Sequence, residues 1–297
     1  MRIRFANPYL LLTLTSLFWA GNMVIGRGLR EAVPPMALAF WRWTIALALV
    51  LPFALPHLRT QWPRIRAHWP AVIVLGILGV GCYNTFAYVA LQYTTATSAT
   101  LLNSFTPIAT IALAFLLLGK RLTRLEAAGV LVSLAGVMII VGRGSFETLL
   151  GFSLNTGDLW MLLAVSIWGA YTVGLQWRPT GVDPMLMLAA FTVVGVAMLV
   201  PLYAWEISGG RSIAASPTTI AGILYTGVFP GFLGYVFYNH GVAAVGPSRA
   251  SLFIHLMPVF ATLLAAVFLG ERPQGYHVAG IVLVFVGIFL TTRRSAG

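Results

Sequence analysis

Long apolar segments follow one another along nearly the whole chain, and short stretches with charged residues or prolines separate them. Each segment has roughly 18 residues or more, which is enough for a helix to cross the hydrocarbon core of a bilayer. Ten such segments occur, at about 9–29, 34–56, 70–91, 96–118, 123–142, 157–176, 184–205, 217–241, 247–269 and 274–292. The pattern therefore predicts an all-α integral membrane protein with ten transmembrane helices.

The composition excludes the soluble classes of protein. Of the 297 residues, 59% are hydrophobic and only 8% are charged, whereas a soluble domain carries about 25% charged residues. Ten spans use almost the whole length, so we expect no separate soluble domain. The single cysteine, Cys82, cannot form an intramolecular disulfide, and no thiol pair offers a metal or redox site.

The positions of lysine and arginine predict the topology. The net charge of +11 does not come from one basic run or face, as nucleic-acid binding requires. If the N-terminus is cytoplasmic, twelve of these residues fall on the cytoplasmic side and five in the outer loops. Such a bias in short loops orients membrane proteins. We therefore expect a bacterial inner-membrane protein with both termini in the cytoplasm.

The N-terminal Met-Arg-Ile-Arg and the apolar run after it resemble a signal peptide. The run is longer than such a peptide requires, no small-residue cleavage site follows it, and nine further apolar segments come after. The first segment is therefore predicted to be the first transmembrane helix.

An internal repeat is the most informative feature of the sequence. Shifting the chain by 151 positions pairs 98–141 with 249–292 and gives eleven identities in 44 positions. Trp19 and Trp168 correspond at a shift of 149. The matched features are a proline within a segment, a Leu-Gly-[Lys/Glu]-Arg turn and two spaced glycines, found at Pro107 and Pro258, at 118–121 and 269–272, and at Gly129, Gly136, Gly280 and Gly287.

Each repeat holds five spans, an odd number, so the second repeat must enter the membrane in the opposite sense to the first. Inverted repeats of this kind are typical of transporters. We expect one five-helix half at 1–142, a periplasmic linker at 143–156 and a second half at 157–297.

These residues resemble the EamA type of the drug/metabolite transporter superfamily, in which each half ends in the proline, the Leu-Gly-[Lys/Glu]-Arg turn and a glycine-spaced helix. The resemblance covers the whole chain and is greatest to the aromatic amino acid exporters of that family. It implies ten helices, a central cavity between the halves and export of small metabolites from the cytoplasm by alternating access. The two Leu-Gly-[Lys/Glu]-Arg turns differ at their third residue, which is Lys120 in the first half and Glu271 in the second. A role that needs a carboxylate at this position therefore cannot apply to both halves.

Polar and aromatic stripes indicate the transport pathway, because polar side chains inside a bilayer face the bundle interior or a cavity. Trp and Tyr can also form interfacial belts, and Asn and Tyr can join helices by hydrogen bonds. For the two tryptophans near mid-span we favour cavity lining, and for the other residues both interpretations stay open. The expected substrate-binding residues are Trp19, Asn22, Tyr83, Asn84, Tyr88, Asn103, Trp168, Tyr171, Tyr235, Asn239 and His255.

Four residues are candidate hinges. Pro107 and Pro258 each remove a backbone hydrogen bond within a span, and Gly81 and Gly231 lie in glycine-rich spans whose backbone is permissive. The alternative is a static kink that only shapes the bundle.

Two titratable side chains lie near mid-membrane. His255 is the natural proton carrier if there is one, although a lone histidine is more often a hydrogen-bonded structural residue. Arg42 could receive a substrate carboxylate, but pairing with helix-end carbonyls or extension toward the outer interface is the favoured interpretation. All seven acidic residues fall in loops or at helix ends, which argues against proton antiport of lipophilic cations and favours a facilitator or weakly coupled exporter.

The candidate cavity suits a neutral or zwitterionic substrate with an aromatic or apolar body. Phosphorylated substrates would need several central cations, and an intramembrane enzyme would need an acid beside Ser251 and His255. The sequence thus predicts an exporter of aromatic or other neutral amino acids and related metabolites. The alternative is a broad-specificity small-metabolite or drug exporter. We expect no cofactor, metal, nucleic acid or obligatory protein partner, only the small-molecule substrate and the lipid bilayer.

Overall fold

The structure is a computed structural model that describes residues 7–145, 147, 155–269 and 274–292. Most of the predicted linker at 143–156 and part of the second Leu-Gly-Glu-Arg turn lie outside the described residues. The described part contains ten helices that are long and apolar enough to cross a membrane. The all-α class and the ten spans are therefore confirmed.

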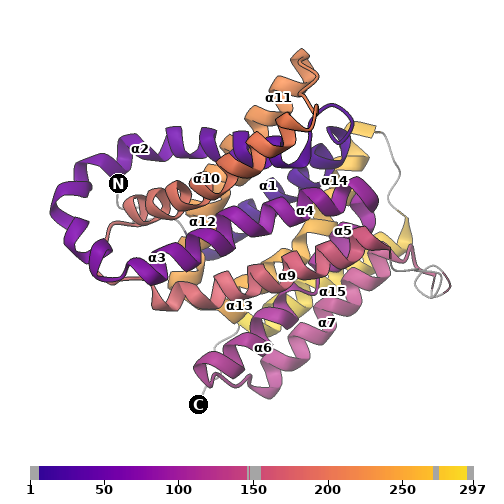
Figure 1. Cartoon of the computed structure of the whole chain (residues 1–297). Coiled ribbons are helices and arrows are strands. Elements are labelled where there is room, and N and C mark those ends of the chain that lie inside the picture. Colours follow the sequence, from indigo (N-terminus) through magenta and orange to yellow (C-terminus); the bar gives the residue numbers. More distant parts are fainter. Residues whose placement is uncertain (1–6, 146, 148–154, 270–273, 293–297) are drawn as a thin grey trace.

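In the first half, the helices of the five spans are α1 Pro8–Gly28; α2 Pro35–Ala67; α3 Trp69–Gly76, η1 Ile77–Cys82 and α4 Tyr83–Tyr93; α5 Ala96–Asn103 and α6 Thr106–Leu118; and α7 Arg124–Val141. In the second half, they are α9 Thr156–Gly174 with η2 Leu175–Trp177; α10 Pro184–Ser208; α11 Pro217–Thr226, η3 Gly227–Leu233 and α12 Gly234–Val245; α13 Pro247–Leu252, η4 Phe253–His255 and α14 Leu256–Leu269; and α15 Gly275–Thr292. Figure 1 shows these helices packed side by side in one bundle.

The second span is longer than the sequence predicts. Its predicted end at residue 56 is the point where polar residues begin, but α2 continues to Ala67. The helix passes through Pro52, Pro56 and Pro63, each of which removes a backbone donor. The added part is mostly exposed and carries arginines in its last turn, so a change from apolar to polar residues does not end the helix.

Spans three and eight each contain a π-helical segment in the middle, η1 in the first half and η3 in the second. The predicted hinge residues Gly81 and Gly231 lie in these two segments, and both are buried. A π turn shifts the backbone hydrogen bonds and is common at functional sites. Pro230 in η3 also removes a backbone donor. These segments leave carbonyl groups in the bundle interior for side chains to bond.

Spans four and nine are each divided where the sequence places the repeated proline. The helix α5 ends at Asn103, and α6 begins at Thr106 with Pro107 in its first turn. In the second half, η4 separates α13 from α14, and Pro258 is in the first turn of α14. A proline costs little in a first helical turn. The expected mid-helix kink is therefore a break between two helices, at equivalent places in both halves.

The last helix of each half, α7 and α15, pack against each other through glycines, as expected for close helix contact in membranes (Figure 1). A Cβ atom added to Gly129 would lie 2.6 Å from the carbonyl oxygen of Gly287, and one added to Gly136 would lie 2.6 Å from that of Gly280. Gly129 corresponds to Gly280 and Gly136 to Gly287 in the repeat. The two crossings are thus equivalent, as an inverted repeat requires.

Candidate functional site

Seven aromatic side chains from both halves pack together at the centre of the bundle. The Trp19 and Trp168 rings meet edge to face, with centroids 5.0 Å apart. Both side chains are buried, with 6% and 1% exposed, so the alternative of an interfacial belt is wrong for them. The other members of this aromatic cluster are Trp43, Tyr83, Tyr171, Tyr235 and Tyr238.

The rings of the aromatic cluster touch each other instead of lining an open space. The Trp168 ring lies 4.7 Å from Tyr83, 5.0 Å from Tyr171 and 5.3 Å from Tyr235, measured between centroids. Edge-to-face and tilted contacts of this kind add about 0.5–1.5 kcal/mol each beyond burial. The aromatic cluster therefore closes the centre of the bundle in this structure, and the central cavity that the resemblance implies is not open at this level.

Two matching hydrogen bonds flank the aromatic cluster. In the first half, Tyr88 in α4 donates to Asn22 Oδ1 in α1 at 2.8 Å. In the second half, Tyr171 in α9 donates to Asn239 Oδ1 in α12 at 2.9 Å. Asn22 corresponds to Tyr171 at a shift of 149, and Tyr88 to Asn239 at 151. The repeat has therefore kept one amide–phenol bond in each half while exchanging the helices that carry the amide and the phenol.

The π segments supply equivalent carbonyl acceptors on the two sides of the aromatic cluster. Trp19 Nε1 donates to the carbonyl of Pro230 at 3.1 Å. Tyr235 donates to the carbonyl of Gly79 and accepts from Asn84 Nδ2 at 3.2 Å. Gly79 and Pro230 are 151 positions apart, so they are equivalent in the repeat. In each half, a side chain from an α-helix thus donates to a carbonyl of the π segment in the other half.

Arg42 is the clearest difference between the halves. Its Nη1 donates to Asn22 Oδ1 at 2.8 Å and to Tyr88 Oη at 2.9 Å, and its Nη2 donates to the carbonyl of Pro230 at 3.1 Å. The side chain is 1% exposed, so extension to the interface is wrong, and the carbonyl it bonds is in a π segment instead of at a helix end. The helices α2 and α10 begin at Pro35 and Pro184, a shift of 149 that makes Phe191 its counterpart.

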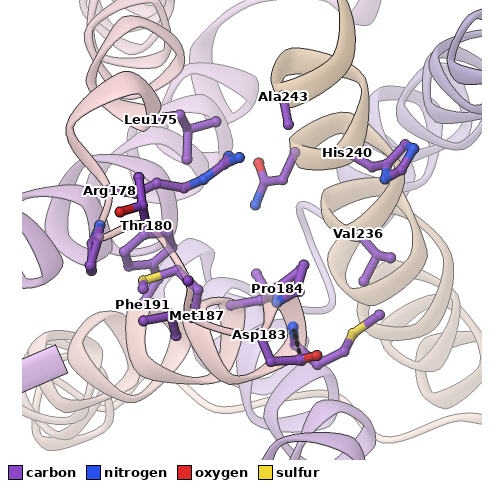
Figure 2. Close-up of a pocket in the computed structure, with 16 residues that line it drawn as sticks. Leu175, Arg178, Thr180, Asp183, Pro184, Met187, Phe191, Val236, His240 and Ala243 are labelled. Atoms are coloured by element: carbon purple, nitrogen blue, oxygen red, sulfur yellow. Dashed lines mark hydrogen bonds between the residues drawn. The ribbon is translucent and has the colours of Figure 1, made fainter. Parts of the chain in front are cut away.

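A pocket of about 480 Å³ lies in the second half, between η2, the loop 178–183, α10 and α12. Figure 2 shows side chains of these helices around an open space. The loop 178–183 that borders it follows the sixth span, an even number, so its mouth is on the same side of the bundle as both termini. Its lining includes Leu175, Arg178, Asp183, Phe191, Asn239 and His240.

The pocket has a polar mouth and an apolar interior. Arg178, Asp183 and His240 bring a cation, a carboxylate and an imidazole to it, while Phe191 lies two turns along α10 from the mouth. Burial lowers the pKa of the Arg178 guanidinium, which nevertheless stays charged at neutral pH. A largely apolar wall with a few polar groups is the usual form of a small-molecule site.

Among the predicted binding residues, Asn239 is the one that lines this pocket, and its bond to Tyr171 connects the pocket to the aromatic cluster. Asn103 reaches the cluster through Tyr83, which donates to it at 3.2 Å. Thus the structure brings together most of the residues that the sequence selects, but as a closed cluster beside the pocket.

His255 is the exception, because it lies apart from the aromatic cluster. Its Nδ1 is 2.7 Å from Ser133 Oγ and its Nε2 is 2.8 Å from the carbonyl oxygen of Ser104. Both ring nitrogens are occupied, and the side chain is fully buried. The geometry is that of a structural histidine which holds the break between α5 and α6 against α7. Among the described residues, no group of three His, Cys, Asp or Glu could hold a metal ion.

Four aromatic or cationic residues of this site are not among those predicted from the sequence, namely Trp43, Arg178, Phe191 and Tyr238. Tyr238 is about one helical turn after Tyr235, so helical phase could have indicated it. Trp43 directly follows Arg42, and a charge within an apolar span is rare enough to mark its neighbour as well. Phe191 could have been found by applying the 149-residue shift to Arg42. No pattern in the sequence marks Arg178 as a pocket residue, because it lies in a loop.

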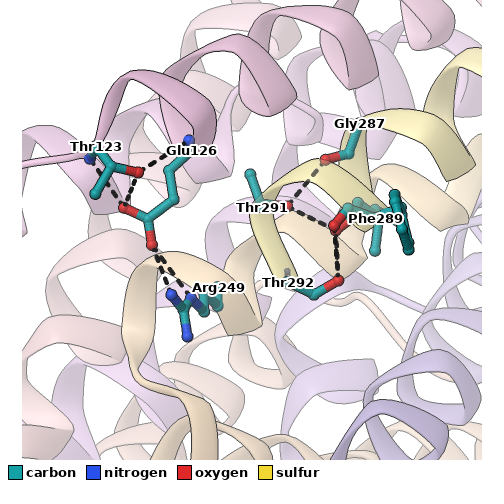
Figure 3. A network of polar contacts seen from close by, with 8 residues as sticks. Thr123, Glu126, Arg249, Gly287, Phe289, Thr291 and Thr292 are labelled. Atoms are coloured by element: carbon teal, nitrogen blue, oxygen red, sulfur yellow. Dashed lines mark hydrogen bonds and ion pairs between the residues drawn. The ribbon is translucent and has the colours of Figure 1, made fainter. Parts of the chain in front are cut away.

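An ion pair joins the two halves at the start of α7 and of α13 (Figure 3), and the order of the spans places it on the same side as the pocket mouth. Thr123 caps α7 together with Glu126, and the same carboxylate accepts from Arg249 Nη2 at 3.0 Å and Nε at 3.2 Å. Glu126 is in α7 of the first half and Arg249 in α13 of the second. The equivalent positions at the other side are His277 and Ser98, which cannot form the same ion pair.

Known proteins resemble the chain over nearly its whole length. A family model described as the EamA-like transporter family matches residues 7–142 and 155–293. An uncharacterized transporter of Archaeoglobus fulgidus is 31% identical over 298 residues, with 98% of this chain and 99% of the relative covered. A probable terminal-alkyne amino-acid exporter of Streptantibioticus cattleyicolor is 28% identical, with 96% and 93% covered. One crystal structure has the same fold, with a TM-score of 0.75, 23% identity and 95% of each chain covered.

Proposed function

Because the chain belongs to the EamA-like transporter family, we propose that it exports aromatic or other neutral amino acids by alternating access, from a bacterial cytoplasm across the inner membrane. The family and its relatives are transporters, so the expectation that the chain is not an enzyme is confirmed. The observation that carries the proposal is the aromatic cluster, which both halves build and which lies directly beyond the pocket.

The position of the pocket mouth supports export. It opens on the side where α1 begins and α15 ends, and the twelve-to-five distribution of lysine and arginine favours a cytoplasmic location for that side. A pocket that opens to the cytoplasm and ends at a closed centre corresponds to a state that takes up its substrate from inside the cell.

The chemistry of the pocket supports a zwitterion with an aromatic body. Arg178 and Asp183 place one positive and one negative group on its wall, so a zwitterion meets a partner for each of its charges. Beyond them, Phe191 and the aromatic cluster offer ring surfaces to an aromatic side chain. The relative from Streptantibioticus cattleyicolor, named for an amino acid as its cargo, supports the same substrate class.

Alternating access requires the halves to move, and the repeated breaks are where we propose the bending. Gly81 and Gly231 lie in the π segments, and Pro107 and Pro258 begin the second helices of spans four and nine. A break in the hydrogen-bond ladder bends at lower cost than a continuous helix. Pro107 and Pro258 are equivalent in the repeat, and Gly81 and Gly231 lie in equivalent π segments, which suits a motion that alternates between the halves.

A broad-specificity exporter of small metabolites or drugs is the second candidate. Met185 and Met187 both line the pocket, and methionine adapts its shape to different ligands. The pocket volume of about 480 Å³ is also within the range of drug-sized sites.

Counterflow uptake into proteoliposomes tests the proposal. Labelled phenylalanine, tryptophan, threonine and lysine are compared with a lipophilic organic cation, in the wild type and in Trp19→Ala and Trp168→Ala. We expect uptake of the aromatic amino acids and its loss in both variants. The control is Trp205→Ala, which changes a tryptophan that is 70% exposed on the outer surface.

Uptake of the cation together with all four amino acids would favour the broad exporter. Uptake of none of the amino acids by the wild type would contradict the proposal. An aromatic preference that survives both cluster substitutions would show that the cluster does not select the substrate.

A further inference from the structure

Arg42 is a cation buried inside the bundle, about two turns from the start of α2, with neutral groups around it. Its acceptors are the Asn22 amide, the Tyr88 hydroxyl and the Pro230 carbonyl, and the Trp43 ring lies below its guanidinium at 5.4 Å. The ion pairs found in the described part of the chain do not include Arg42. Charged groups inside a membrane are retained when they have a function or a partner, and the described carboxylates supply no partner.

Arg42 also keeps a donor unused. Its Nε has no hydrogen-bond partner, and the same holds for Nε1 of the adjacent Trp43, although both side chains are fully buried. Guanidinium has five N–H donors in a planar fork, and a carboxylate accepts two of them in parallel. A buried guanidinium with a free Nε is thus ready to take a carboxylate ligand.

The repeat shows where this guanidinium would meet a ligand. The pocket of the second half is lined by Leu175, Phe191 and Asn239, and their counterparts in the first half are Gly26, Arg42 and Tyr88. The first-half position is closed in this structure. A Cβ atom on Gly26 would lie 3.1 Å from the Tyr88 ring and from Leu91, and the hydrogen bonds of Arg42 tie α1, α2 and α4 together. Arg42 is therefore at the inner end of a closed counterpart of the open pocket.

We propose that Arg42 is the carboxylate-binding residue of the transport pathway and that it becomes accessible when the first-half pocket opens on the side away from the termini. In this structure Asn22 and Tyr88 hold the guanidinium in place of the substrate. The carboxylate replaces these neutral acceptors and neutralises the buried charge. The inference rests on the proposed function, because it assigns the carboxyl group of an amino-acid cargo to one residue of this chain. It predicts that cargo must carry a carboxylate.

The test compares ligands with and without the carboxylate in the wild type, Arg42→Gln and Arg42→Lys. Counterflow of labelled phenylalanine is competed with phenylalaninamide and with 3-phenylpropanoate, and thermal stabilisation of the purified protein by each compound gives a readout independent of transport. The matched control is Arg27→Gln, since Arg27 is partly buried and bonds the Leu91 carbonyl without facing the pocket.

We expect the wild type to prefer phenylalanine to its amide and Arg42→Gln to reduce this preference at least tenfold, a ratio that corresponds to about 1.4 kcal/mol. Arg42→Lys keeps the charge but not the planar fork, so it should retain part of the preference. Arg27→Gln should leave the ratio of the two ligands unchanged, because a purely structural arginine lowers the binding of both alike.

Two outcomes would overturn the assignment. One is amino-acid uptake by Arg42→Gln with the same carboxylate preference as the wild type. If that variant does not fold, a phenylalanine affinity in Arg42→Lys equal to that of the wild type has the same meaning. These results leave the proposed function standing. The other is a wild type that neither takes up amino acids nor is stabilised by 3-phenylpropanoate, which overturns the proposed function and the role of Arg42 together.

Discussion

The two halves of the protein contain the same amide–phenol bond, yet the first half is closed around its bond and an open pocket reaches the bond of the second half. In the first half, Asn22 and Tyr88 are bonded to each other and both also accept hydrogen bonds from the Arg42 guanidinium. In the second half Phe191 stands in place of the arginine, and the pocket extends to Asn239. We call each bond and its neighbour a gate. The first gate, formed by Asn22, Tyr88 and Arg42, is charged and multiply bonded. The second gate, formed by Tyr171, Asn239 and Phe191, has one hydrogen bond and no charge.

This difference has a consequence for a transport cycle. An inverted repeat allows the halves to exchange conformations, so that a pocket alternates between the two sides. The second half is open in this structure while its single bond, between Tyr171 and Asn239, stays intact. Opening the first half requires Arg42 to leave three neutral acceptors inside the membrane, where an unpaired charge is costly. The first gate should therefore open best when a carboxylate replaces those acceptors.

The largest effect is expected for Trp168, at the centre of the aromatic cluster between the two halves. Trp168 is 1% exposed and touches the aromatic residues of both halves. Trp168→Ala should lower the free energy of unfolding by about 3–5 kcal/mol through the cavity it leaves. Thermal or denaturant unfolding in detergent measures this loss. Trp205→Ala, on the outer surface, should change it by less than about 0.5 kcal/mol; equal losses in both variants would contradict a central role for the cluster.

The next prediction separates the two gates. Tyr88 lies between Asn22 and Arg42, so Tyr88→Phe removes an acceptor for a buried charge and should cost about 1.5–3 kcal/mol of stability. Tyr171 makes one bond, to Asn239, and Tyr171→Phe should cost about 1 kcal/mol. Unfolding of the two variants under the same conditions makes the comparison. If Tyr171→Phe is the more destabilising change, the first gate is not the stronger one.

The sequence predicts the number of spans and the repeated positions in the two halves, but it does not predict where each helix ends or where its backbone is irregular. The repeated register places Trp19 and Trp168 at one depth in both halves, but it does not predict that their rings meet and close the centre. Long apolar runs are a property of composition, so the number of spans is predicted correctly. By contrast, the end of α2 depends on three prolines that the helix accommodates, and the π segments in spans three and eight leave no distinctive residue pattern.

Helical phase gives the face of a helix on which a residue lies but not the neighbour it meets. His255 and Asn103 are both on polar stripes, yet His255 contacts Ser133 and Asn103 contacts Tyr83. The same limit explains Arg42, whose acceptors come from three helices distant in sequence. The location of the pocket could not be predicted from the sequence. It depends on which half is open in a given conformation, and the residues of one half do not determine that alone.

A third prediction concerns access to the two gates. Met187 is 4% exposed and borders the open pocket, so a shorter cysteine at this position faces that space, whereas its counterpart Leu38 is 2% exposed at the closed position. In a Cys82→Ser background, Met187→Cys should react with a membrane-impermeant maleimide added from the side of the termini, while Leu38→Cys should react slowly from either side. Each tenfold difference in rate corresponds to about 1.4 kcal/mol between the two states. Equal labelling of both cysteines would mean that the halves are equally open, and labelling of Met187→Cys from the opposite side only would contradict the predicted topology.

The smallest effect is expected for the ion pair between Glu126 and Arg249, which joins the halves on one side of the membrane only. Both side chains are partly exposed, at 18% and 33%, and such pairs contribute about 0.2–1 kcal/mol. The pair is present in the state whose pocket opens toward the termini, so Glu126→Gln should shift the population toward the opposite state. Met187→Cys labelling should then slow by no more than about fivefold, the ratio for 1 kcal/mol, and the difference should shrink at high salt. Glu31→Gln is the matched control, because its pair with Arg30 is within one loop and Glu31 is 83% exposed. Unchanged labelling in Glu126→Gln would mean that the ion pair forms equally well in both states, and the difference between the gates would then rest on Arg42 and Phe191 alone.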